Sequence, residues 1–559
     1  MPKKSQACLC TTLGFVLTFP AMAAPSLPDA GQLSRELQKQ PELNEPAVVQ
    51  PLRAQDPIAR PAGDANDLRF AVKAVRISGS NDAVPLGDLQ ALVADLVGGE
   101  HSLAELDAGA ERITAYYRQH DYVVARAYLP AQEIKDGVVV IQVLPGLLGR
   151  QQLRNQSRLS DAQASAYLAD IKPGDALQAS PVDRALLLLA DTPGVGGARA
   201  TLQPGASVGT SDLVIELDPS KAYSAIVSAN NYGGRYTGEN QLDVALGLNS
   251  PLQMGDQLTL RALTSDMNMR YARIAYQLPL GESGLQLGAS YADTHYELGR
   301  DFAALQARGR AANSTAYAAF PWLRTPTTQV TSLLVWEGKD LLDTTGAPVT
   351  SSSKQVHLAT LGLNGNHQDA WWDGGVTAWN ASLVSGKLSL DAATLAIDSA
   401  SAQSSGHFTR ATYSLSRLQR LGQSDSVSLA VSGQLANKNL GSSEKFALGG
   451  ASGVRAYPQG EGSGDEGWMV NLELRHEAMQ GLQGVAFYDL GSVTVNHHPF
   501  VPTPNLRNIA GAGLGLNAQY ADVQLKAAVA WRTEGGAAKS EPATMNRNPR
   551  LWIQASAQF

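Results

Sequence analysis

Two patterns of apolar and polar residues divide the chain at about residue 220. Before this point, leucines and valines recur three or four residues apart, as on one face of a helix, between short alternating runs. Beyond it, helical spacing disappears and apolar residues occupy every second position, as in Leu551, Ile553, Ala555, Ala557 and Phe559. The pattern predicts α+β domains followed by a large antiparallel β unit.

About sixteen alternating segments of roughly ten residues fill 220–559, and an oily face opposite a polar face suits strands between lipid and water. In a membrane such strands must close into a barrel, because an open edge leaves backbone groups unpaired in hydrocarbon. A soluble β-sandwich also alternates. The strand number, the C-terminal Phe559, interpreted as an assembly signal, and eight tryptophans expected to form interfacial girdles favour a transmembrane barrel. The tryptophans are Trp322, Trp336, Trp371, Trp372, Trp379, Trp468, Trp531 and Trp552.

Two segments before the barrel share the order β-α-α-β-β. In residues 68–146, a helix is predicted to begin after Ser102, which can form a capping box with Glu105. In residues 147–219, a leucine-rich helix precedes a glycine-rich turn and two strands. The repeated order predicts an internal duplication, although two unrelated α+β domains would give the same pattern.

The N-terminus reads as a secretory signal over 1–23, with lysines, an apolar core and small residues before the cleavage point. Residues 24–67 are predicted to be a linker with one short helix, in which Leu33 and Leu37 share a face. Recurring prolines predict that the rest of this segment is an extended, solvated tether. The only cysteines, Cys8 and Cys10, lie in the signal.

Composition excludes several classes of function. With a net charge of −7 and no basic patch, the chain is not expected to bind nucleic acid. It contains no H-E-x-x-H or EF-hand motif, and neither an enzyme nor a cofactor or metal site is expected. The acidic, glycine-rich stretch Gly460–Gly467 is interpreted as a flexible loop rather than a calcium site.

Three motifs resemble those of the two-partner secretion transporters, the haemolysin-activator family of POTRA-plus-barrel proteins. They are Asn231–Gly238 with Asn249–Leu252, Thr192–Val195 with the downstream Ser211–Leu213, and Val454-Arg455-Ala456-Tyr457. The resemblance implies two periplasmic POTRA domains and an outer-membrane barrel of about sixteen strands, with the loop 439–466 folded into its lumen. It also implies that the helix with Leu33 and Leu37 plugs the barrel at rest.

The third motif implies a lock for this loop. In the family, an arginine at the loop tip pairs with the aspartate of an Asp-x-Gly strand, so the resemblance points to Arg455 and Asp489, with Val454 and Tyr457 beside them. A guanidinium fork suits a carboxylate in a poorly screened lumen. Ala456 replaces the family's glycine, which would strain the loop if this position had a positive φ. Phe487 shares a face with Asp489. A phenylalanine on the lumen face is acceptable where it packs against the inserted loop.

The resemblance implies export of a large secreted exoprotein, an adhesin, haemolysin or toxin, driven without ATP by folding of the cargo outside. The open edge of the second POTRA sheet, at Arg199, Thr201 and Gln203, is expected to capture extended cargo by β-augmentation. Outer-membrane lipid and the barrel assembly machinery are the other expected partners, and the chain is expected to be monomeric. The alternatives are an insertase of the same superfamily and, less in keeping with the duplicated domains, a passive porin or receptor.

Overall fold

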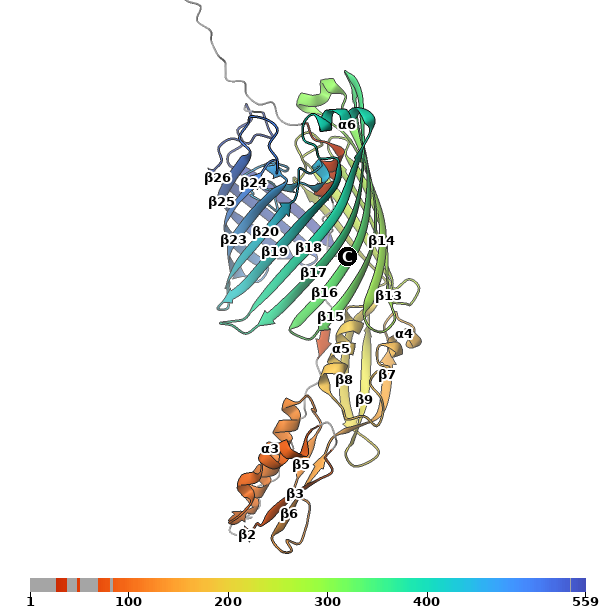
Figure 1. The fold of residues 1–559 in the computed structure, drawn as a ribbon, viewed down its shortest axis with the longest axis vertical. Helices are drawn as coiled ribbons and strands as arrows, with labels where there is room; N and C mark the ends of the chain where they lie inside the picture. The colour runs from red at the N-terminus through yellow and green to blue at the C-terminus, as the bar shows by residue number, and fades with distance from the viewer. Residues whose placement is uncertain (1–26, 38–47, 51–68, 81–83, 543) are drawn as a thin grey trace, which may run out of the picture.

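The computed structural model describes residues 27–37, 48–50, 69–80, 84–542 and 544–559. Figure 1 shows a barrel above two small α+β domains that follow one another below its periplasmic end. The signal predicted over residues 1–23 lies outside the described residues. Of the helices described, none is both long enough and apolar enough to cross a membrane.

Sixteen antiparallel strands form the closed barrel. They are β10 (Tyr223–Asn230), β11 (Gln241–Asn249), β12 (Gln257–Ser265), β13 (Arg270–Leu280), β14 (Leu285–Glu297), β15 (Arg308–Arg324), β16 (Thr328–Gly346), β17 (Val349–Asp369), β18 (Gly375–Leu390), β19 (Gly406–Leu421), β20 (Asp425–Ala436), β23 (Glu466–Met479), β24 (Leu482–Thr494), β25 (Leu506–Tyr520), β26 (Val523–Glu534) and β27 (Arg550–Gln558). The predicted all-β barrel of about sixteen strands is confirmed.

The barrel closes where β27 pairs with β10, from Ile226 opposite Gln558 to Asn230 opposite Gln554. Phe559 extends this seam, because its N–H donates to the carbonyl of Ala225 and its carbonyl accepts from the Ala225 N–H. No strand of the barrel is therefore left as an open edge, which is the condition for a sheet in hydrocarbon.

The two-residue alternation sorts side chains between lipid and lumen. Leucines and aromatic residues such as Leu334, Trp336 and Leu383 are exposed on the outer wall. One prediction is wrong: Trp552 is no girdle residue, because only 4% of it is exposed and its indole N–H donates to the carbonyl of Arg455. It sits at an inward position of β27, where its N–H finds a buried acceptor.

The first α+β domain contains β2 (Arg69–Ala71), β3 (Ala74–Ser78), α2 (Leu86–Ala91), the 3₁₀ helix η1 (Ala94–Leu96), β4 (Glu100–Ser102), α3 (Leu103–Gln119), β5 (Arg126–Tyr128) and β6 (Val138–Leu144). The helix α3 has the predicted capping box, since Ser102 Oγ accepts from the Glu105 N–H and the Glu105 carboxylate accepts from the Ser102 N–H. Its buried face packs on the sheet β3-β6-β5 around Ile113 and Ile141.

The second domain contains β7 (Leu147–Asn155), α4 (Asp161–Ala166), α5 (Ala179–Ala190), β8 (Val195–Pro204) and β9 (Thr210–Pro219). A short strand from the N-terminal linker, β1 (Val48–Gln50), joins its sheet in the order β1-β8-β9-β7. The linker was predicted to be wholly solvated, and this is wrong for residues 48–50. Backbone pairing with β8 is the reason, because an open sheet edge offers hydrogen-bonding groups to any extended chain.

The second domain is bound to the periplasmic turns of the barrel. Arg324, at the end of β15, forms a two-bond ion pair with Asp191 at 2.6 and 2.8 Å. Arg184 of α5 donates to the carbonyl of Pro321 at 3.1 Å, and Leu188 packs beside Gly284. Polar and apolar contacts together fix this domain beneath the barrel mouth.

Candidate functional site

The helix α1 (Ala30–Leu37) lies inside the barrel, where Figure 1 shows it as a red segment near the extracellular end. Leu33 and Leu37, which the sequence placed on one face, are both buried and pack with lumen residues such as Leu263, Leu341 and Leu358. An eight-residue helix is marginal alone in water, so this packing is what stabilises it.

Polar contacts hold both ends of α1. At its start, Asp29 Oδ1 accepts from the Gln32 N–H at 2.9 Å, while Asp29 Oδ2 accepts from Lys354 Nζ at 2.8 Å and Ser442 Oγ at 2.6 Å. At its end, the Leu37 carbonyl accepts from Arg261 at 3.2 Å. The helix is therefore fastened at its two ends to different barrel strands and, at its start, to the inserted loop.

The inserted loop approaches α1 closely. A Cβ atom on Gly31 would lie 2.6 Å from Ser442 Oγ and 2.8 Å from the Ser443 backbone nitrogen, so only glycine fits this contact. Arg35 donates to the Ser442 carbonyl at 3.3 Å. Helix and loop consequently form one internal obstruction, although they are some 400 residues apart in sequence.

The loop itself includes the 3₁₀ helix η3 (Ser442–Glu444) and the short strands β21 (Phe446–Ala447) and β22 (Ser463–Gly464). Glu444 is buried between Lys339 and Arg410, at 2.8 and 3.0 Å. Burial opposes ionisation of this carboxylate, but the two cations outweigh it and lower its pKa to about 2. The carboxylate thus remains charged and ties the base of the loop to two barrel strands.

The structure brings Arg455 and Asp489 together at the loop tip. The guanidinium donates to both carboxylate oxygens at 2.8 and 2.7 Å, and the Arg455 backbone N–H donates to Asp489 Oδ2 at 3.1 Å. Asn471 completes the carboxylate's shell at 2.8 Å, and Glu473 accepts from the same guanidinium at 2.7 Å. Asp489 has no exposed surface.

Phe487 packs against this pair, because the centre of its ring lies 3.5 Å from the Arg455 guanidinium carbon. The apolar Phe487 on the same face as Asp489 therefore has a physical cause, namely a cation–π contact with the loop inside the lumen. Val454 is fully buried in the same cluster, where its N–H donates to the Leu448 carbonyl at 2.8 Å.

Ala456 does not have a positive φ, so the strain expected from the missing glycine is absent. Its methyl group instead faces Gly511 of β25, where an added Cβ atom would lie 2.3 Å away. Beside it, Tyr457 donates its hydroxyl to the carbonyls of Glu534 and Gly536 at 2.6 and 2.9 Å.

Sequence reasoning missed a second anchor, Glu461. Its carboxylate accepts from Arg507 at 2.7 Å and from the backbone N–H groups of Lys539 and Ser540 at 2.9 and 2.8 Å. Burial opposes its ionisation, but these donors and the Ser540 hydroxyl together lower the pKa of Glu461. The Gly460-Glu461-Gly462 motif was the available signal, because an acid between two glycines fits a tight, buried turn.

The stretch Gly460–Gly467 was interpreted as flexible, and this is wrong. Glu461 and Asp465 are both buried, and their cationic partners are Arg507 and Lys445, each within 2.8 Å. Protein cations satisfy the acids, which is why the turn is packed rather than mobile.

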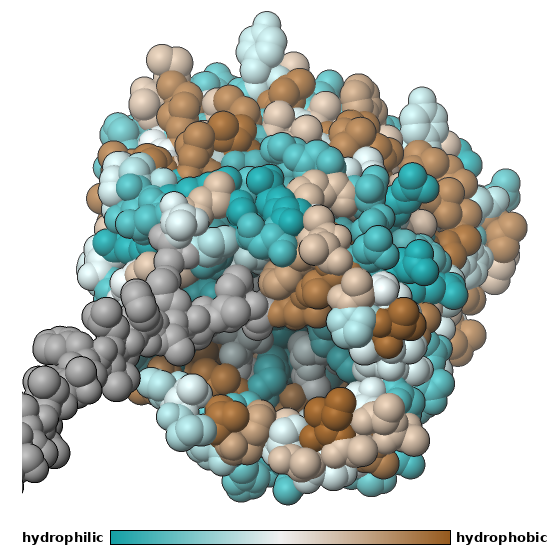
Figure 2. Space-filling view, turned by 90° about the horizontal axis from the view of Figure 1, so that it is seen from above, coloured by the Kyte–Doolittle hydropathy of each residue, from teal (hydrophilic) through white to brown (hydrophobic). Residues whose placement is uncertain are grey.

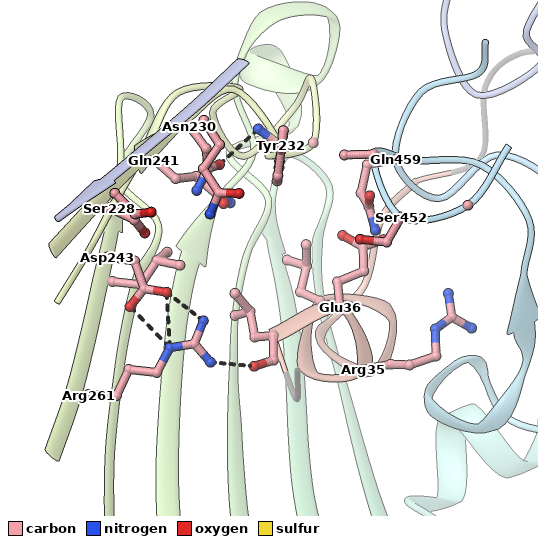
Figure 3. A pocket seen from close by; sticks show the side chains of 18 of the residues that line it. Arg35, Glu36, Ser228, Asn230, Tyr232, Gln241, Asp243, Arg261, Ser452 and Gln459 are labelled. Carbon is pink, nitrogen blue, oxygen red and sulfur yellow. Dashed lines mark hydrogen bonds and ion pairs between the residues drawn. The ribbon is translucent and has the colours of Figure 1, made fainter. Parts of the chain in front are cut away.

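A cavity of about 1090 Å³ remains in the lumen beside α1. Figure 3 shows Arg35 pointing toward the inserted loop, whereas Arg261 lies on the opposite side with Asp243. The wall near the barrel seam is mostly lined by uncharged polar residues, with Lys526 opposite Gln554 and Asp243 opposite Ser228 as the charged neighbours; the uncharged residues are Ser228, Asn230, Gln554, Ser556 and Gln558. Figure 2, viewed from the extracellular end, shows a hollow bordered by both hydrophilic and hydrophobic residues.

The predicted capture edge is partly occupied. In parallel register, Val48, Val49 and Gln50 lie opposite Gly197, Ala198 and Arg199. The expectation of an unpaired edge is therefore wrong at Arg199, whose side chain pairs with Glu216 and Asp218. No described strand pairs with the same edge at Thr201 or Gln203.

A closed barrel whose lumen holds a helix and an inserted loop, above tandem α+β domains, defines a polypeptide-translocating outer-membrane barrel. Residues 209–518 match the family described as "Haemolysin secretion/activation protein ShlB/FhaC/HecB", and residues 70–146 match its ShlB-type POTRA domain. The chain belongs to this family. It is an outer-membrane transporter of the two-partner secretion type, with its POTRA domains in the periplasm.

Relatives cover almost the whole chain. The heme/hemopexin transporter HuxB of Haemophilus influenzae strain 86-028NP is 32% identical over 88% of both chains. The outer membrane transporter CdiB of Dickeya dadantii is 24% identical, over 78% of this chain and 76% of its own. The solved structure of CdiB from Escherichia coli has a TM-score of 0.72 at 18% identity, covering 91% of this chain and 94% of that one, and shows the same fold.

Proposed function

We propose that this transporter is closed at rest by α1 and the inserted loop, and that cargo entry at the second POTRA domain opens it. The observation that carries the proposal is the position of the N-terminal segment. Its helix α1 fills part of the lumen, and ten residues further on its strand β1 covers the edge of β8. One segment thus occupies both the channel and the expected capture edge.

An extended cargo strand would displace β1 by forming the same kind of backbone ladder on β8. The uncovered edge at Thr201 and Gln203 offers a first foothold, from which pairing can spread toward Arg199. Once β1 is released, the tether no longer retains α1, and the helix can leave the lumen. The two sites are coupled because cargo and β1 compete for one edge.

In the lumen, Arg455 and Asp489 would lock the loop tip, with Val454 and Tyr457 packed beneath it. Glu461 would fasten the other side of the tip to Arg507 of β25. These contacts keep the loop on the barrel wall after the plug leaves. Cargo would then pass along the wall at the seam, which is lined mainly by amide and hydroxyl groups.

Folding of the cargo outside the cell would drive export, since the described residues contain no nucleotide motif. The transporter would act as a monomer after a signal over 1–23 is removed and the barrel assembly machinery has inserted it. We divide it into plug and linker (24–67), POTRA domains (68–146 and 147–219) and barrel (220–559). HuxB is named a heme/hemopexin transporter, so we propose that the cargo is an exoprotein that interacts with heme or hemopexin.

A disulfide between β1 and β8 tests the proposal. The only native cysteines, Cys8 and Cys10, lie within the proposed signal, so Val49→Cys with Ala198→Cys introduces a single defined pair. The oxidised double variant should stop secreting a co-expressed exoprotein, and reduction should restore secretion. The two single variants are the controls. Undiminished secretion by the oxidised form would reject displacement of β1, while failure of every variant and the parent to export the exoprotein would reject the cargo assignment.

A further inference from the structure

The outer wall of the barrel carries an apolar groove at β11–β14, with a volume of about 390 Å³. It is formed by Val244, Leu246, Leu260, Ala262, Ala272 and Ile274. These residues face lipid, because their neighbours Asp243, Arg261 and Leu263 line the lumen cavity and side chains alternate along each strand. In a membrane, the acyl chain of a lipid fills a groove of this kind.

A row of basic side chains crosses the extracellular end of this groove. Arg270 of β13 lies opposite His295 of β14, which lies opposite Arg310 of β15. All three side chains point outward, as the groove residues do, because each lies an even number of positions from an outward-facing residue of its own strand or pairs with an outward-facing residue of the next strand. All three are exposed. Adjacent strands are about 4.8 Å apart, so the row spans roughly 10 Å, which matches a phosphorylated headgroup.

The row lies at the height of the outer membrane interface. Ten residues of β13 separate Arg270 from Leu280, beside the periplasmic turn. At a rise of about 3.3 Å per residue and a tilt of about 40°, they span about 25 Å, the height of the apolar band of such barrels. The groove therefore lies within the outer leaflet, and the basic row lies where lipid headgroups begin.

The arginines of this region are only partly neutralised. Asp293 accepts from Arg310 at 2.8 Å and lies 3.0 Å from His295, which orients both side chains along the row. Among the described residues, no ion pair engages Arg270. Tyr291, which lines the groove, lies within 3.4 Å of Arg310 and thereby joins the apolar and basic parts.

We propose that this groove and row form a binding site for a phosphate-bearing, multiply acylated lipid of the outer leaflet. One acyl chain would fill the groove between Leu260 and Ile274. A phosphate would accept charge-assisted hydrogen bonds from Arg270 and Arg310, with His295 between them. Arginine suits this role because its planar fork matches phosphate oxygens. The bound lipid would fix the depth and orientation of the barrel in the membrane on the side formed by β10–β14, next to the seam.

Two kinds of variant test the contacts with the lipid headgroup and those with its acyl chain separately. Arg270→Gln combined with Arg310→Gln removes the two guanidiniums, and Ala272→Leu fills the groove with a side chain that still faces lipid. Lys387→Gln is the matched control, because Lys387 is an exposed cation on β18, away from the groove. Heat-modifiable migration on gels shows that each barrel is folded.

The full-length protein in detergent is titrated with bisphosphorylated lipid A and followed by native mass spectrometry. The double variant should retain about tenfold less lipid A, as expected when charge-assisted hydrogen bonds are lost. Ala272→Leu should also reduce binding, whereas Lys387→Gln should bind like the parent. On the unaltered protein, dephosphorylated lipid A should bind weakly, and inorganic phosphate should not displace the intact lipid.

Equal retention by the parent, the double variant and Ala272→Leu would overturn the proposal. Equal binding of phosphorylated and dephosphorylated lipid to the unaltered protein would do so as well, even if the double variant failed to fold. Displacement of lipid A by inorganic phosphate at a comparable concentration would show that the site binds an anion without using the acyl groove. This result would also contradict the proposal.

Discussion

Asp489 accepts two hydrogen bonds from the guanidinium of Arg455 and a third from the backbone N–H of the same residue. The carboxylate therefore fixes both the side chain and the backbone of the loop tip. Because the pair is buried, removing one partner leaves the other charged and without compensation, at a cost of about 3–5 kcal/mol. Loss of the Asp489 carboxylate would therefore remove more of these contacts than loss of the Arg455 guanidinium.

Asp489→Asn should consequently impair secretion more than Arg455→Lys, although both should leave the barrel assembled. The amide keeps the size of the carboxylate but removes its charge, whereas lysine keeps the charge and loses the fork. Secreted cargo, normalised to heat-modifiable barrel, measures the effect. Asp369→Asn, which breaks a partly buried pair with Arg417 on the periplasmic rim, far from the inserted loop, is the control and should secrete normally. An Asp489→Asn variant with full secretion would remove the lock from the mechanism.

The contact between Ala456 and Gly511 predicts a rescue. Gly511→Ala should displace the loop tip, because the new Cβ atom would lie 2.3 Å from the Ala456 methyl group. Ala456→Gly should remove the shortest contact and leave only the Trp531 carbonyl at 3.0 Å, so the double variant should regain most of the thermal stability and secretion lost by Gly511→Ala. Equal defects in the single and double variants would show that the two positions act independently.

The close approach of Gly31 to the loop predicts how the plug can be expelled. Gly31→Val should weaken docking of α1, since its side chain would overlap Ser442 and the Ser443 backbone. Larger single-channel conductance in planar bilayers is the expected result. Leu27→Val, at an exposed position before the helix, is the control and should leave conductance unchanged. Unchanged conductance of Gly31→Val would mean that α1 does not limit ion flow.

Glu444 predicts a pH dependence for the base of the loop. Its pKa is lowered from 4.5 to about 2, so its ionised form is stabilised in the folded protein. This stabilisation is complete above about pH 4.5 and is lost as the pH falls toward 2. The protection factors of the loop amides, which correct for the pH dependence of intrinsic exchange, should therefore fall over that interval. In Glu444→Gln, protection should be lower at neutral pH and less dependent on pH, and a steep pH dependence of protection retained by this variant would contradict the assignment.

Periodicity predicted the strands and their two faces, because lipid and water on opposite sides of a strand require alternation at every second residue, and the number of strands favoured a barrel over a soluble sandwich. The two α+β domains followed from helical spacing and from local signals such as the Ser102 capping box. The resemblance of the Val454–Tyr457 motif to a known family identified Arg455 and Asp489, two residues that chemistry by itself would have left as an ordinary loop arginine and a strand aspartate.

Tertiary structure decided which distant groups meet. The Glu461 carboxylate lies beside Arg507 and Ser540, Trp552 turns inward to the Arg455 carbonyl, and β1 pairs with β8. Each contact joins segments tens to hundreds of residues apart, and no local pattern encodes its partner. Sequence periodicity determines which face of a strand or helix is buried, whereas barrel closure and chain entry into the lumen determine what lies against that face.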